Sequence, residues 1–380
     1  MTILVDVRML RRGVHSGVEE YTRLLLEHLL ALNRPHRYVL FANGVRGKLP
    51  PSLTGARNVS VVSWNVPNRL LNVSFRFLRR PLVDRRVACD VVFSPHLSLL
   101  TTSRAPHIMT FHDLSFIHHP EFFSRRMRLW HWLQNYRAEA RRAARLIAVS
   151  EFTRRDLIQT FGVAPERVKT VHSGVDPFYR RLPENDAGLR AFRDKHDLAR
   201  PFILFVGTLE PRKNVPGIIR AFDILKTRGA QRELALVLVG RRGWLYDGIA
   251  RAIRGSPHRS DIRLWGSATG EELRYLYNLA AVFTYPSFFE GFGFPVLEAQ
   301  ACGAPVVASN VTSLPEILGE SALLVDPSEV QAIAGAVRQV LESEALRDGL
   351  QERGFVNVKR FSWQRAAEET LKVFERSLEV

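Results

Sequence analysis

Residues 282–303 read VFTYPSFFEGFGFPVLEAQACG and combine a strand, a glycine-rich loop and a helix in one short stretch. The apolar run Val282–Tyr285 predicts a buried strand. Pro295 suits the first turn of a helix and Gly303 suits its carboxyl-terminal cap, so the spacing predicts a helix over 295–302. A strand followed by a loop and a helix is the building unit of a parallel sheet that helices cover.

The same alternation continues on both sides of this stretch. In the second half of the chain, apolar runs predict further strands at 202–206, 234–239, 262–265, 305–308 and 323–325, and helical spacing predicts helices over 271–280 and 330–341. In the first half, strands are expected at 3–5, 38–41, 59–62, 91–93, 107–110 and 146–149, with helices over 18–32, 68–80, 125–145 and 151–160. The sequence therefore predicts an α/β protein with two doubly wound parallel sheets.

The chain has 380 residues, which is too long for one hydrophobic core. A polar stretch over 180–200, with Pro183 and Gly188, separates the two series of strands and is typical of a linker. We expect an N-terminal domain over 1–180, a second domain over 181–360, and a closing amphipathic helix over 361–380 that packs back toward the N-terminal domain. Ligands of open α/β sheets bind beyond the carboxyl ends of the strands, so two facing domains would place a site in the cleft between them.

The composition excludes several classes of protein. Hydrophobic residues make up 46% and charged residues 24%, which are ordinary globular values and exclude wholesale disorder. Cys89 and Cys302 are too few for a disulfide framework or a cysteine-based metal site. No run of 18 or more apolar residues is present, and no basic segment precedes the first apolar run, so we expect a cytoplasmic protein.

The net charge of +16 is concentrated in the first half of the chain. Residues 1–180 contain 28 Lys and Arg against 13 Asp and Glu, whereas the remainder contains 26 against 25. Such an excess attracts a nucleic acid, an anionic membrane surface or a phosphorylated substrate. Residues 68–87 and 125–145 interleave arginines with Leu, Phe and Trp, so each segment could lie on a membrane or pack its apolar side on the sheet. No helix-turn-helix, zinc-finger or RNA-binding signature is visible, which argues against nucleic acid.

Three loops after predicted strands carry residues suited to ligand binding. Residues 13–20, GVHSGVEE, open a helix, where backbone N–H groups can receive a phosphate or the glycines serve only a steric role. His112 follows a strand without a second ligand at metal spacing, so it is a cleft residue or an ordinary loop histidine. In residues 207–214, GTLEPRKN, Arg212 and Lys213 form a turn that can hold a diphosphate or carry incidental surface charge.

The loop before the 295–302 helix is the most informative of all. Gly291 and Gly293 let the backbone approach a ligand at the positive end of that helix. Glu290 lies before the helix and Glu298 lies about one turn inside it. Carboxylates at these positions suit sugar hydroxyls, which supply the O–H donors that a carboxylate accepts.

Together these motifs resemble the retaining nucleotide-sugar glycosyltransferases of family 4, and the resemblance covers essentially the whole chain. It rests on Glu290 and Glu298 at their spacing, on residues 207–214, and on SGVEEY at 16–21, HD at 112–113, SNVTSLPE at 309–316 and FSW at 361–363. The SGVEEY loop and the TLEPRKN turn look most like bacterial mannosyltransferases that build O-antigen and related surface polysaccharides. The resemblance implies a GT-B fold, in which two Rossmann-like domains face each other.

The resemblance also implies a role for each matching residue. Arg212 and Lys213 would bind the donor diphosphate, Glu290 would meet hydroxyls of the transferred sugar, and His112 would contact its O6 hydroxyl. Glu298 would hold the ribose of the donor. Backbone at the remaining donor-binding positions would assist, namely Gly17, Gly207, Gly293 and Phe294. No cofactor or divalent metal is implied, because the cations and the helix end take the part of a metal ion.

The implied reaction moves mannose from GDP-mannose, with an α linkage, to a lipid-linked or lipopolysaccharide glycan, and a donor β-phosphate oxygen serves as the base. The implied partners are the nucleotide-sugar, a glycan or lipid-diphosphate-linked acceptor, and the anionic inner face of the cell membrane, where the enzyme would be peripheral. Two alternatives remain at this point. One is a nucleotide-sugar epimerase on the same fold, which would act on a UDP-sugar alone, and the other is a basic nucleic-acid-binding protein.

Overall fold

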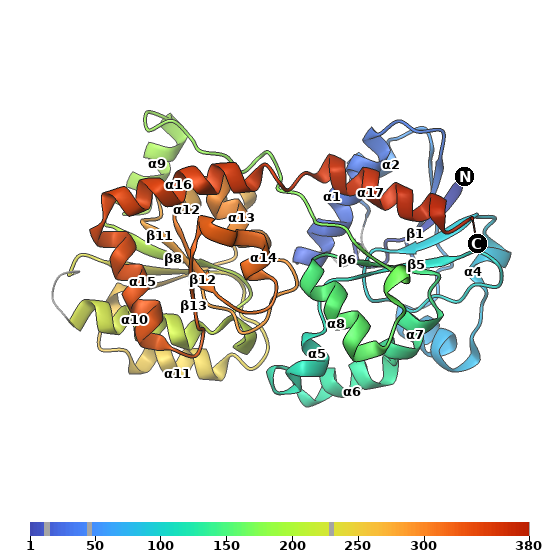
Figure 1. The fold of residues 1–380 in the computed structure, drawn as a ribbon, viewed down its shortest axis with the longest axis horizontal. Coiled ribbons are helices and arrows are strands. Elements are labelled where there is room, and N and C mark those ends of the chain that lie inside the picture. The colour runs from blue at the N-terminus through green and yellow to red at the C-terminus, as the bar shows by residue number, and fades with distance from the viewer. Residues whose placement is uncertain (11–15, 44–47, 228–231, 380) are drawn as a thin grey trace. The chain divides into compact units, whose positions relative to one another are not determined.

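The structure is a computed structural model that describes residues 1–10, 16–43, 48–227 and 232–379. The chain divides into two compact units, each with its own sheet and helices (Figure 1). Unit 1 contains Met1–Leu114, Arg126–Gly174 and Ser362–Val380, and unit 2 contains Ser115–Arg125 and Val175–Phe361. The chain changes unit at 174/175 and at 361/362, close to the expected boundaries at 180/181 and 360/361. Residues 115–125 group with unit 2, whereas the sequence-based division placed them in the N-terminal domain.

Unit 1 is built on a seven-stranded sheet in the order β3-β2-β1-β4-β5-β6-β7. All its strand pairs are parallel. The strands are β1 Thr2–Asp6, β2 Arg37–Phe41, β3 Val59–Val62, β4 Val91–Ser94, β5 His107–Phe111, β6 Arg145–Ala148 and β7 Val168–Thr170. The sequence analysis missed β7 because this short edge strand, with exposed Lys169, has no continuous apolar run.

The helices of unit 1 include α1 Gly17–Ala31, α2 Pro51–Thr54, α3 Asn68–Val73 with the π-helical continuation Ser74–Leu78, and α4 Val83–Arg86. The later ones are α6 Arg125–Gln134, α7 Tyr136–Arg142 and α8 Glu151–Phe161. The predicted single helix over 125–145 is wrong. Asn135 adopts a left-handed φ of 47° and caps α7 by accepting a hydrogen bond from the backbone N–H of Ala138, so the helix breaks there.

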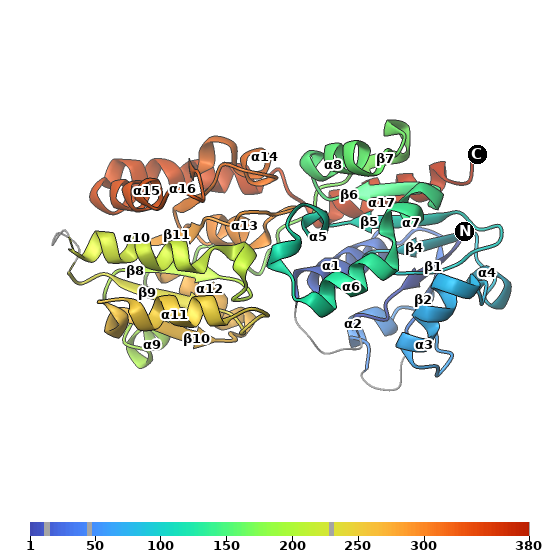
Figure 2. The same ribbon diagram turned by 90° about the horizontal axis from the view of Figure 1, so that it is seen from below.

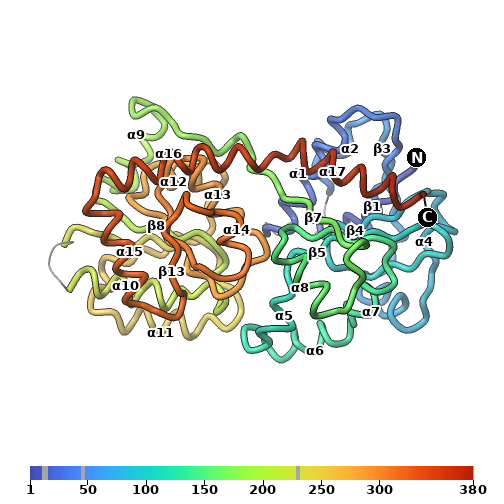
Figure 3. The backbone as a smooth tube through the Cα atoms, in the orientation of Figure 1, coloured from blue at the N-terminus to red at the C-terminus, as the bar shows by residue number. Residues whose placement is uncertain are grey.

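The last helix, α17 Trp363–Arg376, packs against α1 within unit 1. Figure 3 shows this red segment beside the blue start of the chain. Trp363 contacts Tyr21 with ring centroids 5.7 Å apart, and Phe374 contacts Phe93 at 4.9 Å. A Cβ on Gly174 would lie 2.1 Å from the backbone nitrogen of Trp363, so this close approach requires a glycine.

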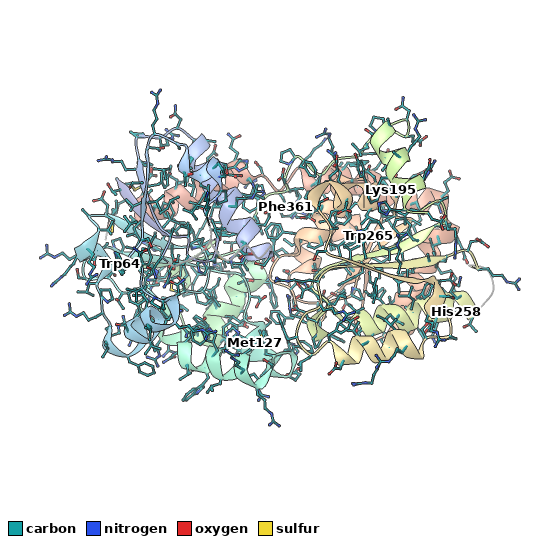
Figure 4. The ribbon with its side chains drawn as sticks, turned by 180° about the vertical axis from the view of Figure 1, so that it is seen from behind. Trp64, Met127, Lys195, His258, Trp265 and Phe361 are labelled. Atoms are coloured by element: carbon teal, nitrogen blue, oxygen red, sulfur yellow. The ribbon has the colours of Figure 1, made fainter. Side chains whose placement is uncertain are left out.

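Unit 2 is built on a six-stranded parallel sheet in the order β10-β9-β8-β11-β12-β13. The strands are β8 Phe202–Val206, β9 Ala235–Val239, β10 Ile262–Gly266, β11 Val282–Tyr285, β12 Val306–Ser309 and β13 Leu323–Val325. The helices that lie around this sheet (Figure 2) are α9 Ala187–Lys195, α10 Val215–Thr227, α11 Asp247–Gly255, α12 Gly270–Leu279, α13 Phe294–Ala301, α14 Leu314–Leu318, α15 Val330–Glu342 and α16 Glu344–Val358. Trp265, labelled in Figure 4, packs against His196 at the end of α9, with ring centroids 4.8 Å apart.

Residues 115–125, which include α5 Ser115–His118, pack on unit 2 through aromatic rings. Phe122 stacks on Phe288 with ring centroids 5.8 Å apart, and His118 stacks on Phe289 at 5.7 Å. Trp244 donates its indole N–H to the carbonyl oxygen of Phe122 at 2.5 Å. This segment therefore covers the two phenylalanines that directly precede Glu290. Among the helices in the described part of the chain, none is long and apolar enough to cross a membrane.

Candidate functional site

The loops that follow β8 and β11 meet at one edge of the unit 2 sheet. β8 has β9 on one side and β11 on the other, so the strand order reverses at β8. Connections on the two sides of such a point leave in opposite directions, and ligands of α/β folds bind there. The turn that carries Arg212 and Lys213 follows β8, and the loop that carries Glu290 follows β11.

The turn after β8 is held in a fixed shape by its own backbone. Pro211–Lys213 forms a 3-10 turn, and Asn214 ends it with a left-handed φ of 53°. The Asn214 side chain donates to the carbonyl oxygen of Pro327 at 2.6 Å. The backbone N–H of Phe288 donates to the carbonyl oxygen of Arg212 at 2.9 Å, which ties the two loops together.

Arg212, Lys213 and Glu290 form one ion-paired cluster. Lys213 Nζ donates to Glu290 Oε1 at 2.5 Å and to the Tyr285 hydroxyl at 2.6 Å. Arg212 Nη1 donates to Glu290 Oε2 at 3.0 Å and to the carbonyl oxygen of Phe289 at 2.7 Å. Arg212 Nε also donates to Glu210 Oε1 at 3.1 Å. Two cations and two carboxylates therefore occupy this corner of the sheet, and the three side chains predicted for different parts of a donor share one network.

Burial and charge oppose each other in setting the protonation of this cluster. Burial by itself raises the pKa of Glu290, but the neighbouring Arg212 and Lys213 outweigh it and lower the pKa to about 2. Burial and the nearby Arg212 guanidinium lower the pKa of Lys213, and Glu290 acts in the opposite direction. Glu290 is therefore ionised at neutral pH and acts only as a hydrogen-bond acceptor.

The backbone of Glu290 is held by residues of the 309–316 segment. The Thr312 hydroxyl accepts a hydrogen bond from the Glu290 N–H at 3.1 Å, and the Ser313 hydroxyl donates to the Glu290 carbonyl oxygen at 3.0 Å. Thr312 adopts a left-handed φ of 59°, which is costly for a β-branched residue. Such strain is tolerated where the surroundings fix the conformation, and here it places the hydroxyl that orients Glu290.

Helix α13 begins directly after this loop. Gly293 precedes it with a φ of 100°, and a Cβ at this position would lie 2.8 Å from Leu314 Cδ2, so glycine is required for both reasons. Phe294 is the first helical residue and is half-buried. Glu298 lies one turn further along and accepts a hydrogen bond from the buried Tyr277 hydroxyl at 2.9 Å. The helix therefore presents its positive end and one oriented carboxylate on the same side of the sheet edge.

Gly207 marks the end of β8, where the backbones of two strands come close. A Cβ on the neighbouring Gly240, at the end of β9, would lie 1.9 Å from the Gly207 carbonyl oxygen. A Cβ on Gly207 would lie 3.9 Å from Lys213 Cε. Gly207 therefore lies beside the Lys213 stem and belongs to the same sheet edge as the ion-paired cluster.

His112 and Gly17, the remaining predicted residues, lie in unit 1. The His112 Nε2 atom lies 2.9 Å from the carbonyl oxygen of Pro95, in the loop after β4. Because a carbonyl can only accept, Nε2 carries the hydrogen, and burial lowers the pKa of the imidazole, which leaves Nδ1 as an acceptor. Tyr21 of α1 contacts the His112 ring edge-on, with centroids 4.7 Å apart.

Gly17 is the first residue of α1, and it follows a capping box. Ser16 accepts from the backbone N–H of Glu19, and Glu19 accepts from the backbone N–H of Ser16 at 2.9 Å. A carboxylate therefore already satisfies part of this helix start. Residues 13–15, the first part of the predicted phosphate loop, lie outside the described residues.

Three residues of the site were not singled out by the sequence analysis. Glu210 pairs with Arg212, Tyr285 accepts from Lys213, and Tyr277 orients Glu298. Glu210 and Tyr285 both lie inside stretches quoted for other reasons. Tyr285 ends a predicted strand and Glu210 lies in the turn after another, and that position is the signal that identifies them. Tyr277 lies in the last turn of α12 and has no such signal. Across the described ranges, no group of three or more His, Cys, Asp or Glu side chains is arranged to hold a metal ion.

The stability contributed by Glu290 is expected to disappear in acid. Its pKa in the folded chain is about 2, below the ordinary value of 4.5, so the contribution is complete above the ordinary value and is lost as the pH falls toward 2. The loss in the free energy of unfolding that corresponds to this pKa difference is about 3 kcal/mol. In denaturant titrations, the difference in unfolding midpoint between wild type and Glu290→Gln should narrow steadily from pH 6 to pH 3. A constant difference would contradict the ion-paired assignment.

Tyr285→Phe is expected to lower the alkaline pKa of the pH–rate profile. The substitution removes the hydroxyl that accepts from Lys213 Nζ, so the charged ammonium loses a partner and gives up its proton at lower pH. The rate of the catalysed reaction at neutral pH should fall about tenfold, because that factor corresponds to the free energy of one hydrogen bond to a charged group. Tyr246→Phe, in unit 2 before α11, is the control and should leave the profile unchanged. An unshifted alkaline limb in Tyr285→Phe would show that the hydroxyl does not act on Lys213.

Comparisons with known proteins show the family of the chain. Residues 15–178 match the family described as Glycosyltransferase Family 4, and residues 190–357 match the family described as Glycosyl transferases group 1. The chain is 36% identical over 271 residues to O-antigen chain mannosyltransferase B of Escherichia coli, with 70% of each protein covered.

Solved structures agree on the fold. Sucrose-phosphate synthase of Thermosynechococcus elongatus superposes with a TM-score of 0.77 at 18% identity, covering 99% of this chain and 98% of that one. The Anabaena protein HepE, solved with UDP and glucose, superposes with a TM-score of 0.72 at 20% identity, covering 98% of each chain. At these identities the likeness concerns the GT-B fold alone. The chain therefore belongs to the family 4 glycosyltransferases and is a glycosyltransferase of the GT-B fold, because both family models match it, the O-antigen relative covers most of it and each of its two units contains a parallel sheet.

Proposed function

We propose that this enzyme transfers mannose from GDP-mannose, with retention of configuration and an α linkage, to a lipid-linked or lipopolysaccharide glycan. The observation that carries the proposal is the cluster of Arg212, Lys213 and Glu290 beside the start of α13. A diphosphate needs cations and N–H donors, and a sugar needs a carboxylate acceptor, and these groups lie together at the switch point of the unit 2 sheet. The choice of mannose is supported by the name of the Escherichia coli relative.

Each group of the cluster has a defined part in this proposal. Lys213 and Arg212 stabilise the negative charge that builds on the departing diphosphate, together with the N–H groups at the start of α13. Glu290 holds both cations in place and, because it stays ionised, accepts hydrogen bonds from hydroxyls of the sugar. Glu298, oriented by Tyr277, accepts from the ribose hydroxyls of the donor.

The proton chemistry requires no strongly basic side chain. The donor β-phosphate oxygen takes the proton of the attacking acceptor hydroxyl on the face from which the diphosphate leaves. His112 is neutral, and its Nδ1 accepts from the O6 hydroxyl of mannose, so it positions the sugar and leaves the proton transfer to the phosphate. No divalent metal takes part, and a chelator such as EDTA should leave the rate unchanged.

The acceptor places the enzyme on the inner face of the cell membrane. A lipid-diphosphate-linked glycan is held at the membrane surface, so an enzyme without a spanning helix in its described residues would meet this substrate as a peripheral protein. The excess of Lys and Arg over Asp and Glu in residues 1–180 favours association with anionic lipid.

The test is a matrix of donors and acceptors. Purified protein is incubated with GDP-mannose, GDP-fucose, UDP-glucose and UDP-N-acetylglucosamine, each with and without mannosylated acceptors, and products are identified by NMR. We expect a new α-mannosidic linkage with GDP-mannose only when an acceptor is present. Conversion of a UDP-sugar without acceptor would establish the epimerase alternative, and a β linkage would exclude retention.

A further inference from the structure

The surface of α3 and its π-helical continuation is apolar on both sides. Leu71 and Phe75 point inward and belong to the core beside Leu4 and Phe41. Leu70, Val73 and Phe77 follow at helical spacing on the outer side, and they are 63%, 52% and 63% exposed. A surface helix of a globular protein normally has a polar outer side, so this exposed apolar stripe is unusual, although the Arg76 guanidinium lies 5.5 Å from the Phe77 ring centroid.

Helix α6 also exposes large apolar side chains. Leu129 and Trp132 share one side of the helix and are 57% and 76% exposed, and Trp130 is 39% exposed. Seven of the fifteen exposed large apolar side chains in the described ranges belong to α3, its continuation or α6. They are Leu70, Val73, Phe77, Leu78, Leu129, Trp130 and Trp132.

A direct hydrogen bond joins the two segments, although more than forty residues separate them in sequence. Arg76 Nε donates to the carbonyl oxygen of Leu133 at 2.7 Å. Arg79 Nη1 donates to Glu139 Oε1 of α7 at 2.8 Å. Figure 2 shows α3 and α6 on the same side of unit 1, and Figure 4 labels Met127 on α6 at the margin of that side. We give the name docking surface to the set of these seven apolar side chains together with the exposed arginines of the two segments.

The exposed charges within the docking surface are positive. Arg69, Arg80, Arg126 and Arg128 are exposed within the two segments. Residues 28–83 and 122–138 contain no Asp or Glu. Exposed aromatic and aliphatic side chains that alternate with arginines are complementary to a lipid bilayer, which has anionic headgroups at its surface and apolar acyl chains below them.

We propose that the docking surface binds the anionic headgroup layer of a lipid bilayer, with its arginines on the phosphates and Phe77, Trp130 and Trp132 inserted among the acyl chain ends. This proposal rests on the proposed function, because the lipid-linked acceptor is the reason for the enzyme to bind a membrane. A second copy of this chain is a poor occupant, because pairing this surface with itself would bring like charges together. A single-stranded nucleic acid would gain nothing from Leu70 and Val73, which offer no ring to stack on.

Two paired variants of the full chain separate the two parts of the contact. Phe77→Ser with Trp132→Ser removes exposed apolar area, and Arg69→Gln with Arg128→Gln removes charge. Binding is measured by co-sedimentation with vesicles of phosphatidylcholine containing 30% phosphatidylglycerol and with pure phosphatidylcholine vesicles. We expect strong binding only to the anionic vesicles, a loss of about tenfold or more from the apolar pair, and about fivefold for each arginine removed.

Matched controls come from unit 2. Val356→Ser with Leu264→Ser removes exposed apolar side chains, and Arg190→Gln with Arg251→Gln removes exposed charge. Both should bind vesicles like the wild type. All variants alter exposed residues, so thermal unfolding should be unchanged, and a loss of binding then reports on contact with lipid.

The outcomes divide clearly. Equal binding to neutral and anionic vesicles, or unchanged binding by both docking-surface variants, would overturn the proposal. So would a wild-type dimer that these variants dissociate in analytical ultracentrifugation, or single-stranded RNA that competes for the surface at 150 mM salt. Transfer to a water-soluble mannoside should be unaffected, while transfer to a lipid-linked acceptor in vesicles should fall in parallel with binding. Failure of transfer with every acceptor while vesicle binding persists would reject the proposed function and leave the docking surface standing.

Discussion

Glu290→Gln is expected to lower kcat/KM for sugar transfer by about a thousandfold, the upper range for removing one preorganised electrostatic contact. The carboxylate is buried and holds both Arg212 and Lys213, and in the proposed function it also accepts from the sugar. Glutamine keeps the volume and one acceptor oxygen but has no charge, so buried Lys213 loses its counterion and Arg212 keeps only Glu210. Steady-state rates with saturating acceptor and varied donor measure the effect.

Stability must be followed in the same experiment, because breaking a buried ion pair from one side costs about 3–5 kcal/mol. Glu290→Ala would add a cavity to this loss, so the glutamine variant is the better choice. Glu342→Gln, at the exposed end of α15, is the control and should behave like the wild type. Turnover within tenfold of wild type in folded Glu290→Gln would refute the assignment of Glu290 to the sugar and the cations.

Lys213→Met is expected to lower kcat by about a hundredfold or more while the fold survives. Methionine keeps the length of the buried stem, and Glu290 retains Arg212 as a partner. In the proposed function, what is lost is the charge that stabilises the departing diphosphate, an effect that grows along the reaction and therefore acts on kcat more than on KM. Rates at saturating donor, with inhibition by the nucleoside diphosphate product, measure both parts.

A second buried lysine in unit 2 provides a matched control. Lys226 on α10 pairs with Asp261 at 3.0 Å and donates to the carbonyl oxygen of Leu234, away from the cluster. Lys226→Met should reduce stability and leave the rate per folded molecule unchanged. Equal loss of activity in both variants would mean that burying a methionine, and not the missing charge at 213, causes the effect.

Local sequence patterns predicted much of this fold. The strands at 59–62, 202–206, 282–285 and 323–325 begin and end where expected, because each is a short apolar run between turn residues. Ser362 is the N-cap of α17, within the segment 361–380 that was expected to form the closing helix. The predictions failed where the backbone departs from the pattern of apolar spacing. At Asn135 the spacing predicts a continuous helix, but the left-handed backbone divides it into two.

Within the site, the sequence singled out Arg212, Lys213, Glu290 and Glu298, because charged residues after buried strands stand out. It did not reveal that the first three form one network with Glu210 and Tyr285. That contact requires β11 to pair with β8 after the chain has already added β9 and β10 on the other side. The pairing of distant strands is a property of the whole sheet, and no window of residues contains it.

The amino-acid sequence by itself determined most of the strands, several of the helices and the chemical character of their loops, because periodicity, capping and glycine placement act over a few residues. Only the tertiary structure decided which loops meet, that a carboxylate predicted for the sugar also neutralises the cations predicted for the diphosphate, and that two arginine-rich segments share one exposed surface. The physical reason is that burial and ion pairing depend on neighbours in space, and parallel strands acquire those neighbours through long crossovers.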